Sequence, residues 1–245
     1  MKSYKKFANI YDQLIYEDVN YDKISEKIYS LCNKYSVSFD DYLDLACGTG
    51  NVAKRVGKEF KNIFLVDISD DMLVEADKKL TEEKIKAKIV CQDMTELNLN
   101  RKFDLITCVL DSTNYILEEN DLIKYFEGVK NHLKDNGIFI FDINSYYKLS
   151  DVLGNNVFTY NSEEVFYVWE NIFEDNIVEM NLTFFVNHEG LYERFDEVHE
   201  ERAYREEEIE SIITKAGLQI CDKFDGYTDD KVNKGTERII YILRK

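Results

Sequence analysis

The chain has 245 residues, a length that suits one large domain or one domain with a sizeable insertion. Hydrophobic residues make up 44% of it and charged residues 32%, so it can bury a core and is not expected to be disordered. Acidic residues outnumber basic ones by 48 to 31. The resulting net charge of −17, without a basic cluster to hold phosphates, argues against nucleic acid and anionic membranes as partners.

Residues 3–16 begin the chain with apolar side chains at helical spacing, among them Phe7, Ile10, Tyr11 and Leu14. They predict a helix, and the pattern leaves open whether this helix docks on the core or forms a lid over a ligand. A second helix is predicted over residues 21–35.

From residue 42 onward, short apolar strands alternate with helices. The strands are continuous in apolar character, as a sheet covered on both faces requires, and β–α alternation predicts a doubly wound parallel sheet. The predicted strands are 42–46, 62–66, 86–91, 103–110 and 137–142, and the predicted helices are 52–60, 69–79 and 120–133.

After residue 144 the hydrophobic period changes from helical to alternating. The stretches 164–173, 176–187 and 194–204 alternate and are linked by short turns, which predicts antiparallel strands. A helix over 206–216 and strands over 218–227 and 238–244 complete the chain. We therefore expect an α/β fold whose main domain comprises residues 1–145 and 204–245, with an antiparallel β insertion over 146–203.

Compartment is indicated by what the sequence lacks. No apolar run approaches the roughly 18 residues of a membrane span, and the N-terminus has no apolar segment typical of a secretory signal. Five cysteines are widely spread without a C-x-x-C pattern, which indicates reduced thiols and neither a disulfide framework nor a metal site. These features favour a cytoplasmic protein without a bound metal.

The first strand ends in Gly48-x-Gly50 and turns directly into a helix. Glycines let the backbone approach a ligand closely, and a helix N-terminus offers unpaired N–H groups, but this pattern alone is weak. Ligands of such sheets bind at the carboxyl ends of the strands. The ends of strands two to five each carry an acid: Asp67, Asp93, Asp111 and Asp142.

An acid at the end of the second strand suits the ribose of either a dinucleotide or S-adenosylmethionine. Gly48-x-Gly50-x-x-Ala53 also satisfies the dinucleotide fingerprint. Charge favours the second cofactor, because Asp44, Asp93 and Asp111 would repel a pyrophosphate and attract a ligand that carries an ammonium and a sulfonium.

Several motifs together resemble the class I S-adenosylmethionine-dependent methyltransferases, and the likeness covers nearly the whole chain. The first motif is Asp44-Leu-Ala-Cys-Gly48-Thr-Gly50, the second spans residues 65–73, and Gln92-Asp93-Met94 is similar to the third. Residues 103–106 and 133–141 are similar to the later strands. This resemblance implies a seven-stranded Rossmann-like sheet whose last strand runs antiparallel between two parallel ones.

The N-terminal residues 7–12 resemble the Tyr-Asp segment of small-molecule methyltransferases, including N-methyltransferases of amino sugars and glycine. In those enzymes the segment helps to cover the cofactor, which favours the lid interpretation and gives Tyr11 a cofactor contact. The other cofactor-binding residues implied by the resemblance are Asp44, Ala46, Cys47, Gly48, Gly50, Asp67, Ile68, Met72, Asp93, Met94 and Leu110.

The resemblance implies a role for each part of this set. Gly48 and Gly50 would pass the backbone along the methionine moiety, while Asp44 and the Leu110 carbonyl would hold its ammonium. Asp67 would bind the ribose.

At the adenine end, Ile68 and Met72 would lie against the base. Asp93 would take its amino group and Met94 would cover the ring. Met72 could equally pack in the core, whereas for Met94 the ring contact is favoured over ordinary packing. Cys47 is read as a small filler of the loop.

The expected reaction moves the methyl group of S-adenosylmethionine to a small-molecule acceptor, and proximity supplies most of the rate. Candidate bases are Tyr11, Asp111 and Tyr115. His199 could be a base that reaches the site from the insertion, but the interpretation as a surface strand histidine is favoured. An apolar acceptor lining is expected from Tyr167, Trp169, Phe184 and Phe185. An NAD-dependent oxidoreductase and a non-catalytic S-adenosylmethionine-binding module remain alternatives, and the acceptor and oligomeric state are not indicated.

Overall fold

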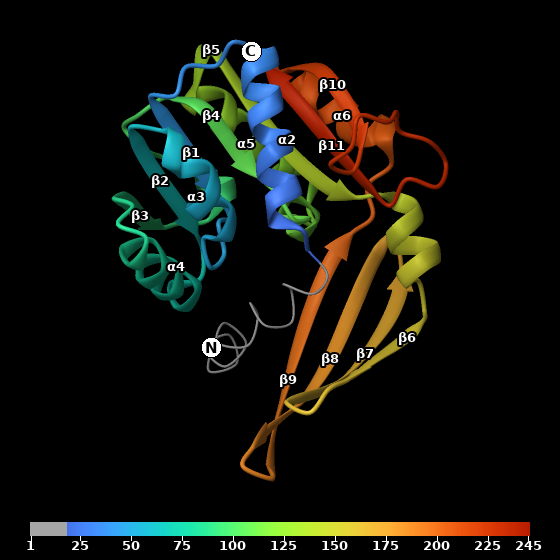
Figure 1. Cartoon of the computed structure of the whole chain (residues 1–245). Coiled ribbons are helices and arrows are strands. Elements are labelled where there is room, and N and C mark those ends of the chain that lie inside the picture. Colours follow the sequence, from blue (N-terminus) through green and yellow to red (C-terminus); the bar gives the residue numbers. More distant parts are fainter. Residues whose placement is uncertain (1–18) are drawn as a thin grey trace.

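The computed structural model describes residues 19–245, which form two β-sheets joined by helices (Figure 1). The predicted helix over residues 3–16, and with it Tyr11, lies outside the described residues.

The larger sheet has seven strands in the order β3-β2-β1-β4-β5-β11-β10. Its strands pair in parallel except β11, which runs antiparallel to both β5 and β10. This confirms the predicted fold class, including the antiparallel terminal strand. The strand bounds are β1 Asp41–Leu45, β2 Asn62–Asp67, β3 Ala87–Cys91, β4 Phe103–Cys108, β5 Leu133–Asn144, β10 Gln219–Asp225 and β11 Arg238–Arg244.

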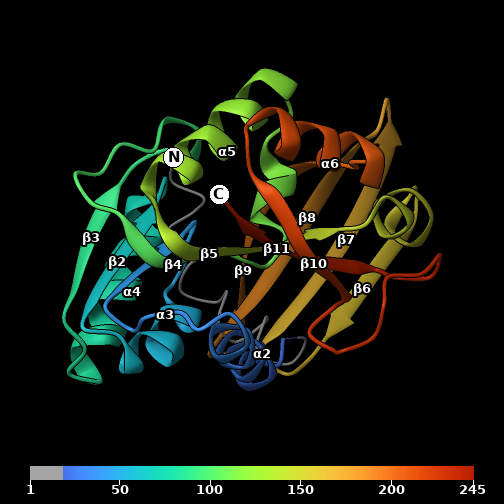
Figure 2. The same cartoon turned by 90° about the horizontal axis from the view of Figure 1, so that it is seen from above.

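Helices cover both faces of this sheet (Figure 2). On one face, buried residues of the helices α2, α3 and α4 pack with alternate residues of the strands in one core cluster. On the other face, α5 and α6 close a second cluster. This two-sided burial explains why every residue of β1 is buried. The helix bounds are α2 Tyr21–Lys34, α3 Asn51–Val56, α4 Asp70–Glu82, α5 Glu119–His132 and α6 Glu206–Lys215.

Most element ends lie within a few residues of the prediction. One difference is at β5, which starts at Leu133, four residues before the predicted start, and pairs there with Phe103. Local propensity does not encode this pairing. The connection from β3 to β4, where no helix was predicted, contains only a short 3₁₀ turn, Met94–Glu96.

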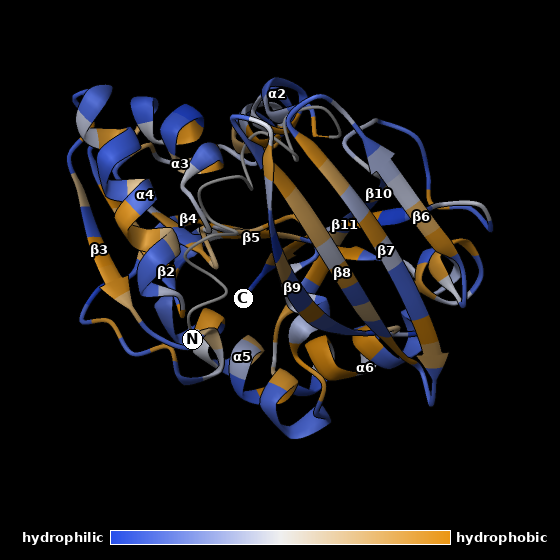
Figure 3. Cartoon of the chain, turned by 90° about the horizontal axis from the view of Figure 1, so that it is seen from below, coloured by the Kyte–Doolittle hydropathy of each residue, from blue (hydrophilic) through white to orange (hydrophobic). Residues whose placement is uncertain are grey.

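The smaller sheet has the order β6-β7-β8-β9 and is wholly antiparallel. Its strands are β6 Val157–Asn161, β7 Val165–Glu174, β8 Ile177–His188 and β9 Leu191–Arg202. It extends away from the larger sheet (Figure 1), and Figure 3 shows hydrophobic and hydrophilic segments along β7 and β8.

Two-residue turns join β7 to β8 and β8 to β9. Asp175, Asn176, Glu189 and Gly190 all have positive φ, as type I′ hairpin turns require. The predicted hairpins are therefore confirmed. Two elements were not predicted from the sequence. One is β6, a short edge strand whose residues are mostly exposed, and the other is the π-helical turn Lys148–Leu153 before it. The limits of the insertion as a separate unit, 146–203, stay a prediction.

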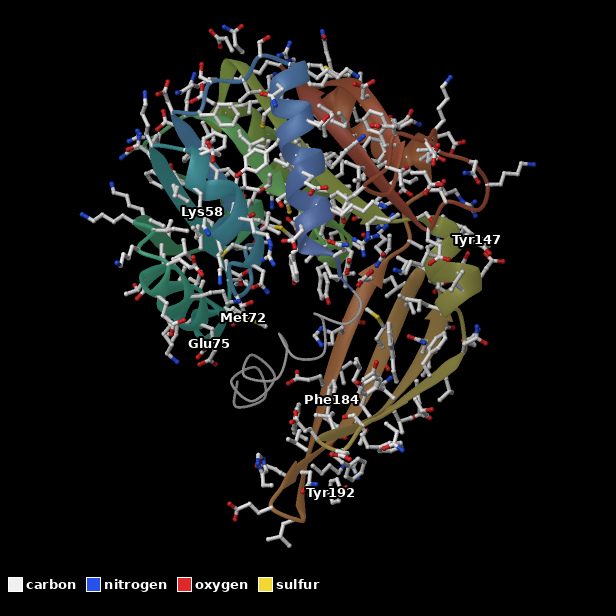
Figure 4. The ribbon with its side chains drawn as sticks, viewed as in Figure 1. Lys58, Met72, Glu75, Tyr147, Phe184 and Tyr192 are labelled. Atoms are coloured by element: carbon white, nitrogen blue, oxygen red, sulfur yellow. The ribbon has the colours of Figure 1, made fainter. Side chains whose placement is uncertain are left out.

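Strand alternation corrects the expected acceptor lining. Tyr167, Phe184 and Phe195 lie in one cross-strand row on the face that also carries His199. Phe185 pairs instead with Phe166 on the opposite face, so its assignment to the same lining was wrong. Figure 4 shows Phe184 part-way along the sheet and Tyr192 near its far tip.

Across residues 19–245, the helices are all too short or too polar to cross a membrane.

Candidate active site

A cavity of about 250 Å³ opens at the carboxyl ends of β1, β2 and β4, where the acids were predicted to gather. Its walls come from the loops after these strands, from α2 and from the insertion strand β9. A second cavity of about 330 Å³ adjoins it. The residues that line both are Ala46, Asp67, Ile68, Met94 and Tyr115, so the two form one elongated site.

The loop after β1 is built from residues with positive φ: Ala46 at 55°, Gly48 at 53° and Gly50 at 75°. A Cβ on Gly50 would meet Ala76 at 3.1 Å, because the loop packs closely on α4. A Cβ on Gly48 would meet no atom of residues 19–245 within 4 Å, and Gly48 lines the cavity. Gly50 therefore serves packing, whereas Gly48 leaves room for a ligand.

Asp67 connects this loop to the end of β2. Its two carboxylate oxygens accept hydrogen bonds from the amides of Gly48 (2.8 Å) and Ser69 (2.9 Å). Burial raises the pKa of Asp67, and these amides oppose the rise. The carboxylate is thereby fixed in direction at the junction of the two cavities.

Asp44 lies deeper, within β1, and is 2% exposed. Thr107 donates to its Oδ1 at 2.8 Å and in turn accepts from the hydroxyl of Tyr42. Oδ2 is buried and has no hydrogen-bond partner of good geometry among residues 19–245. Burial raises the pKa of Asp44 to about 7. A buried oxygen of this kind in a cavity wall matches a ligand that brings a hydrogen-bond donor.

The adenine-side candidates lie at the second cavity or next to it. Ile68 is 68% exposed at the mouth, Met72 is buried in the wall of the first cavity, and Met94 borders both. Asp93 caps the 3₁₀ turn after β3, accepting from the amide and the hydroxyl of Thr95 at 2.8 and 2.7 Å. Cys47 lines the first cavity, and burial raises the pKa of its thiol well above the usual value, so it is protonated and no nucleophile.

The loop after β4 is held by a charge cluster that the sequence reading did not anticipate. Leu110 and Asp111 both have positive φ, and their amides donate to the carboxylate of Asp142 at 2.9 and 2.7 Å. Arg238 of β11 binds Asp142 at 2.5 Å and Asp111 at 2.6 Å. Burial is the largest influence on the pKa of Asp111 and would raise it, but the charges of Arg238 and Lys148 and the hydrogen bonds of Arg238 and Glu201 together lower it. Asp111 is therefore ionised.

The insertion contributes two buried polar residues to the same place. Glu201 of β9, 2% exposed, accepts from the side chain of Asn144 at 2.8 Å. Burial, reinforced by the negative charge of Asp111, raises its pKa well above the usual value, so this carboxyl is protonated at neutral pH.

His199, two residues earlier, is 9% exposed and lines the first cavity, where its Nδ1 lies 3.2 Å from the hydroxyl of Tyr115. Its interpretation as a surface histidine was wrong. The polar residues at alternate positions of β9 (197, 199 and 201) were the signal that one buried face carries function.

The site thus provides the Asp44 oxygen without a hydrogen-bond partner among residues 19–245, open space beside Gly48 and several acids. These features suit the cationic end of S-adenosylmethionine.

Comparison with known proteins agrees with this geometry. Residues 43–137 match the family model described as a methyltransferase domain.

Over its whole length the chain is 33% identical to a protein assigned as a methyltransferase in Geobacillus sp. (strain WCH70), covering 99% of this chain and 100% of that one. A crystal structure of an S-adenosylmethionine-dependent methyltransferase from Clostridium acetobutylicum is 56% identical, with a TM-score of 0.94 over 98% of both chains. The chain is also 27% identical to dTDP-3-amino-3,4,6-trideoxy-alpha-D-glucopyranose N,N-dimethyltransferase of Streptomyces venezuelae, covering 87% and 90% of the two.

The chain belongs to the S-adenosylmethionine-dependent methyltransferases. Within that family its relatives include methyltransferases of small molecules. The NAD-dependent alternative and the non-catalytic alternative are thereby set aside.

Proposed function

We propose that this enzyme methylates an amine of a small-molecule acceptor such as an amino sugar. The resemblance of 87% of the chain to an amino-sugar N,N-dimethyltransferase supports an amine as the nucleophile. The observation that carries the proposal is the shared cavity, in which the glycine loop forms one wall and His199 of the insertion forms another.

The residues predicted to hold the cofactor retain those roles as part of the proposal. Asp44, with its buried unpartnered oxygen, would accept from the methionine ammonium, and Gly48 would leave room for the chain beside it. Asp67 would accept from the ribose hydroxyls, since its carboxylate lies between the two cavities.

The second cavity would hold the adenine. Ile68, Met72 and Met94 would contact the ring, and Asp93 would accept from its amino group. The Leu110 carbonyl would share the ammonium with Asp44. When bound, S-adenosylmethionine supplies a methyl group already activated by the sulfonium, so alignment is the protein's main task.

The acceptor would lie between the first cavity and the face of the insertion that carries His199. Tyr167, Phe184 and Phe195 form an aromatic row on that face, suited to the apolar side of a sugar or other ring. Asp111 is ionised at the cavity wall and would attract a cationic amine. Because its pKa is lowered, Asp111 is a better electrostatic partner than proton acceptor, which leaves Tyr115 as the described candidate base.

A screen for S-adenosylhomocysteine release tests the acceptor class. Amino sugars, both free and nucleotide-linked, would be compared with matched hydroxyl analogues and phenols. We expect release with amines and none with the analogues in which a hydroxyl replaces the amine. Release only with hydroxyl or carboxyl acceptors would overturn the amine assignment. A cytoplasmic location and the absence of nucleic-acid acceptors stay predictions from charge and composition.

A further inference from the structure

The hydroxyl of Tyr115 and the imidazole of His199 form a contact that joins the two sheets at the cavity. Tyr115 ends the 3₁₀ turn Ser112–Tyr115 after β4, and His199 lies on β9, 84 residues later. The oxygen and Nδ1 are 3.2 Å apart, and the rings meet edge to face at 5.9 Å between centroids. Both residues line the 250 Å³ cavity.

A buried amide side chain holds this pair in register. Asn114, directly before Tyr115, donates to the carbonyl of Arg202 on β9 at 2.9 Å and accepts from the amide of Asn144 on β5, also at 2.9 Å. It is fully buried. The turn that carries Tyr115 is therefore tied to the strand that carries His199, so the contact between them belongs to the scaffold.

The surroundings of His199 favour the neutral imidazole. Burial lowers its pKa, and the negative charge of Asp111 opposes this only in part. Within the described part of the chain, the other titratable groups that face it include Tyr115 from the 3₁₀ turn and, from the same face of its own strand, Glu197 and Glu201. A neutral ring can accept the Tyr115 proton at Nδ1, and Asp111 would stabilise the imidazolium that results.

We propose that Tyr115 and His199 form a proton relay that deprotonates the acceptor amine, with His199 as the final proton acceptor. The inference rests on the proposed function, because it needs an amine nucleophile. As the ammonium N–H bond of the acceptor breaks, its proton bonds to the Tyr115 oxygen, while the Tyr115 hydroxyl proton bonds to Nδ1 of His199. The products are a neutral amine, a neutral tyrosine and an imidazolium, which later returns its proton to solvent.

The kinetic test uses dTDP-3-amino-3,4,6-trideoxy-alpha-D-glucopyranose as the amine probe with His199→Asn, Tyr115→Phe and the double variant. At about pH 7 we expect kcat/KM to fall about 10²-fold in each single variant, and no further in the double variant. The loss should shrink by about pH 9.5, where the amine is increasingly neutral without help. A loss that is equal at both pH values would show a merely structural role and overturn the relay.

The matched control is His188→Asn, whose side chain is exposed at the far hairpin. The kcat/KM of this variant should match that of the wild type at both pH values. Calorimetry with S-adenosylhomocysteine should give an affinity within about twofold of the wild type for every variant, which shows an intact cofactor site.

A second measurement needs no acceptor. The protein has three histidines, His132, His188 and His199, so the ring signals can be assigned by NMR with His199→Asn. In Tyr115→Phe, we expect the Nδ1 chemical shift and the pKa of His199 to change while the other two rings stay constant. An unchanged His199 ring would overturn the relay even if the probe is not a substrate. If the wild type methylates none of the amines in the acceptor screen but the ring responds, the amine proposal fails while the contact stands.

Discussion

The guanidinium of Arg238 lies 2.6 Å from the carboxylate of Asp111, across 127 residues of sequence. Its other nitrogen binds Asp142, whose side chain is fully buried and accepts the amides of the loop after β4. The antiparallel last strand thus brings a cation whose charge helps to lower the pKa of Asp111 at the cavity wall. Asp142 also accepts the hydroxyl of Tyr227, which leaves this cluster densely bonded.

Replacing Arg238 by Met should unfold the protein more easily. Removing one partner of a buried ion pair leaves charge uncompensated and typically lowers the free energy of unfolding by about 3–5 kcal/mol. Urea denaturation would measure this change. Arg194→Met is the matched control, because Arg194 and Asp196 form an exposed pair whose loss should remain below about 1 kcal/mol. Equal losses in the two variants would contradict the assigned importance of the buried cluster.

Replacing Asp67 by Ala should weaken cofactor binding. The variant loses the proposed ribose acceptor and the anchor of the Gly48 amide, and bonds to a charged group are typically worth about 1.5–3 kcal/mol, or about 10- to 100-fold in affinity. Calorimetry with S-adenosylmethionine measures this loss of affinity. Asp70→Ala, which removes an exposed acid three residues away, serves as the control. Unchanged affinity in Asp67→Ala would remove the ribose assignment.

Cofactor affinity should rise with pH through about 7. Burial raises the pKa of Asp44 to about 7, and only the carboxylate form attracts an ammonium. S-adenosylhomocysteine titrated between about pH 6 and 8 should therefore bind more tightly at the higher pH, and Asp44→Asn should flatten the dependence. A pH profile that is the same in both proteins would show that another group titrates.

The same residue should affect the stability of the ligand-free protein with the opposite sign. Between its unfolded pKa of about 3.9 and its folded pKa of about 7, Asp44 binds more protons when folded. Its contribution to the free energy of unfolding is therefore largest at low pH and is lost as pH rises through about 7. Comparing the urea midpoints of the wild type and Asp44→Asn across this pH range isolates the contribution of Asp44. If the midpoints of the two proteins change equally with pH, Asp44 makes no such contribution.

Substitutions at three glycines distinguish an effect on backbone conformation from an effect on ligand binding. Gly48→Ala and Gly190→Ala both force alanine to positive φ without a clash, so each should cost about 1–2 kcal/mol of stability. Only Gly48→Ala should also weaken S-adenosylhomocysteine binding, because Gly190 lies in the distant hairpin. Gly50→Ala should cost more than either, since its Cβ would lie 3.1 Å from Ala76. Unaltered binding by Gly48→Ala would mean that the ligand does not approach this position.

Much of the fold could be read from hydrophobic period. The apolar strands buried on both faces, the helical spacing between them and the alternation after residue 144 each have a local origin, and the structure reproduces them. β6 was missed because an exposed edge strand has little apolar pattern to detect.

For the candidate site, too, one part was predictable from the sequence and another part was not. Asp44 lies within β1 and Gly48 follows it, while Asp67 ends β2 and Asp111 follows β4. Parallel strands end at one edge of a sheet, so the meeting of these residues was predictable from their order alone. Their individual roles stay predictions.

What only the tertiary structure decided is which distant residues complete that edge. Arg238 reaches Asp111 because β11 pairs with β5. His199 reaches Tyr115 because the face of the insertion sheet that carries His199 is turned toward the cavity. The sequence by itself determined the cofactor end of the site, where all the groups lie on one run of strands and loops. The acceptor end depends on strand pairing, which brings Arg238 beside Asp111, and on burial, which lowers the pKa of His199 and raises that of Glu201. Neither is encoded in local spacing.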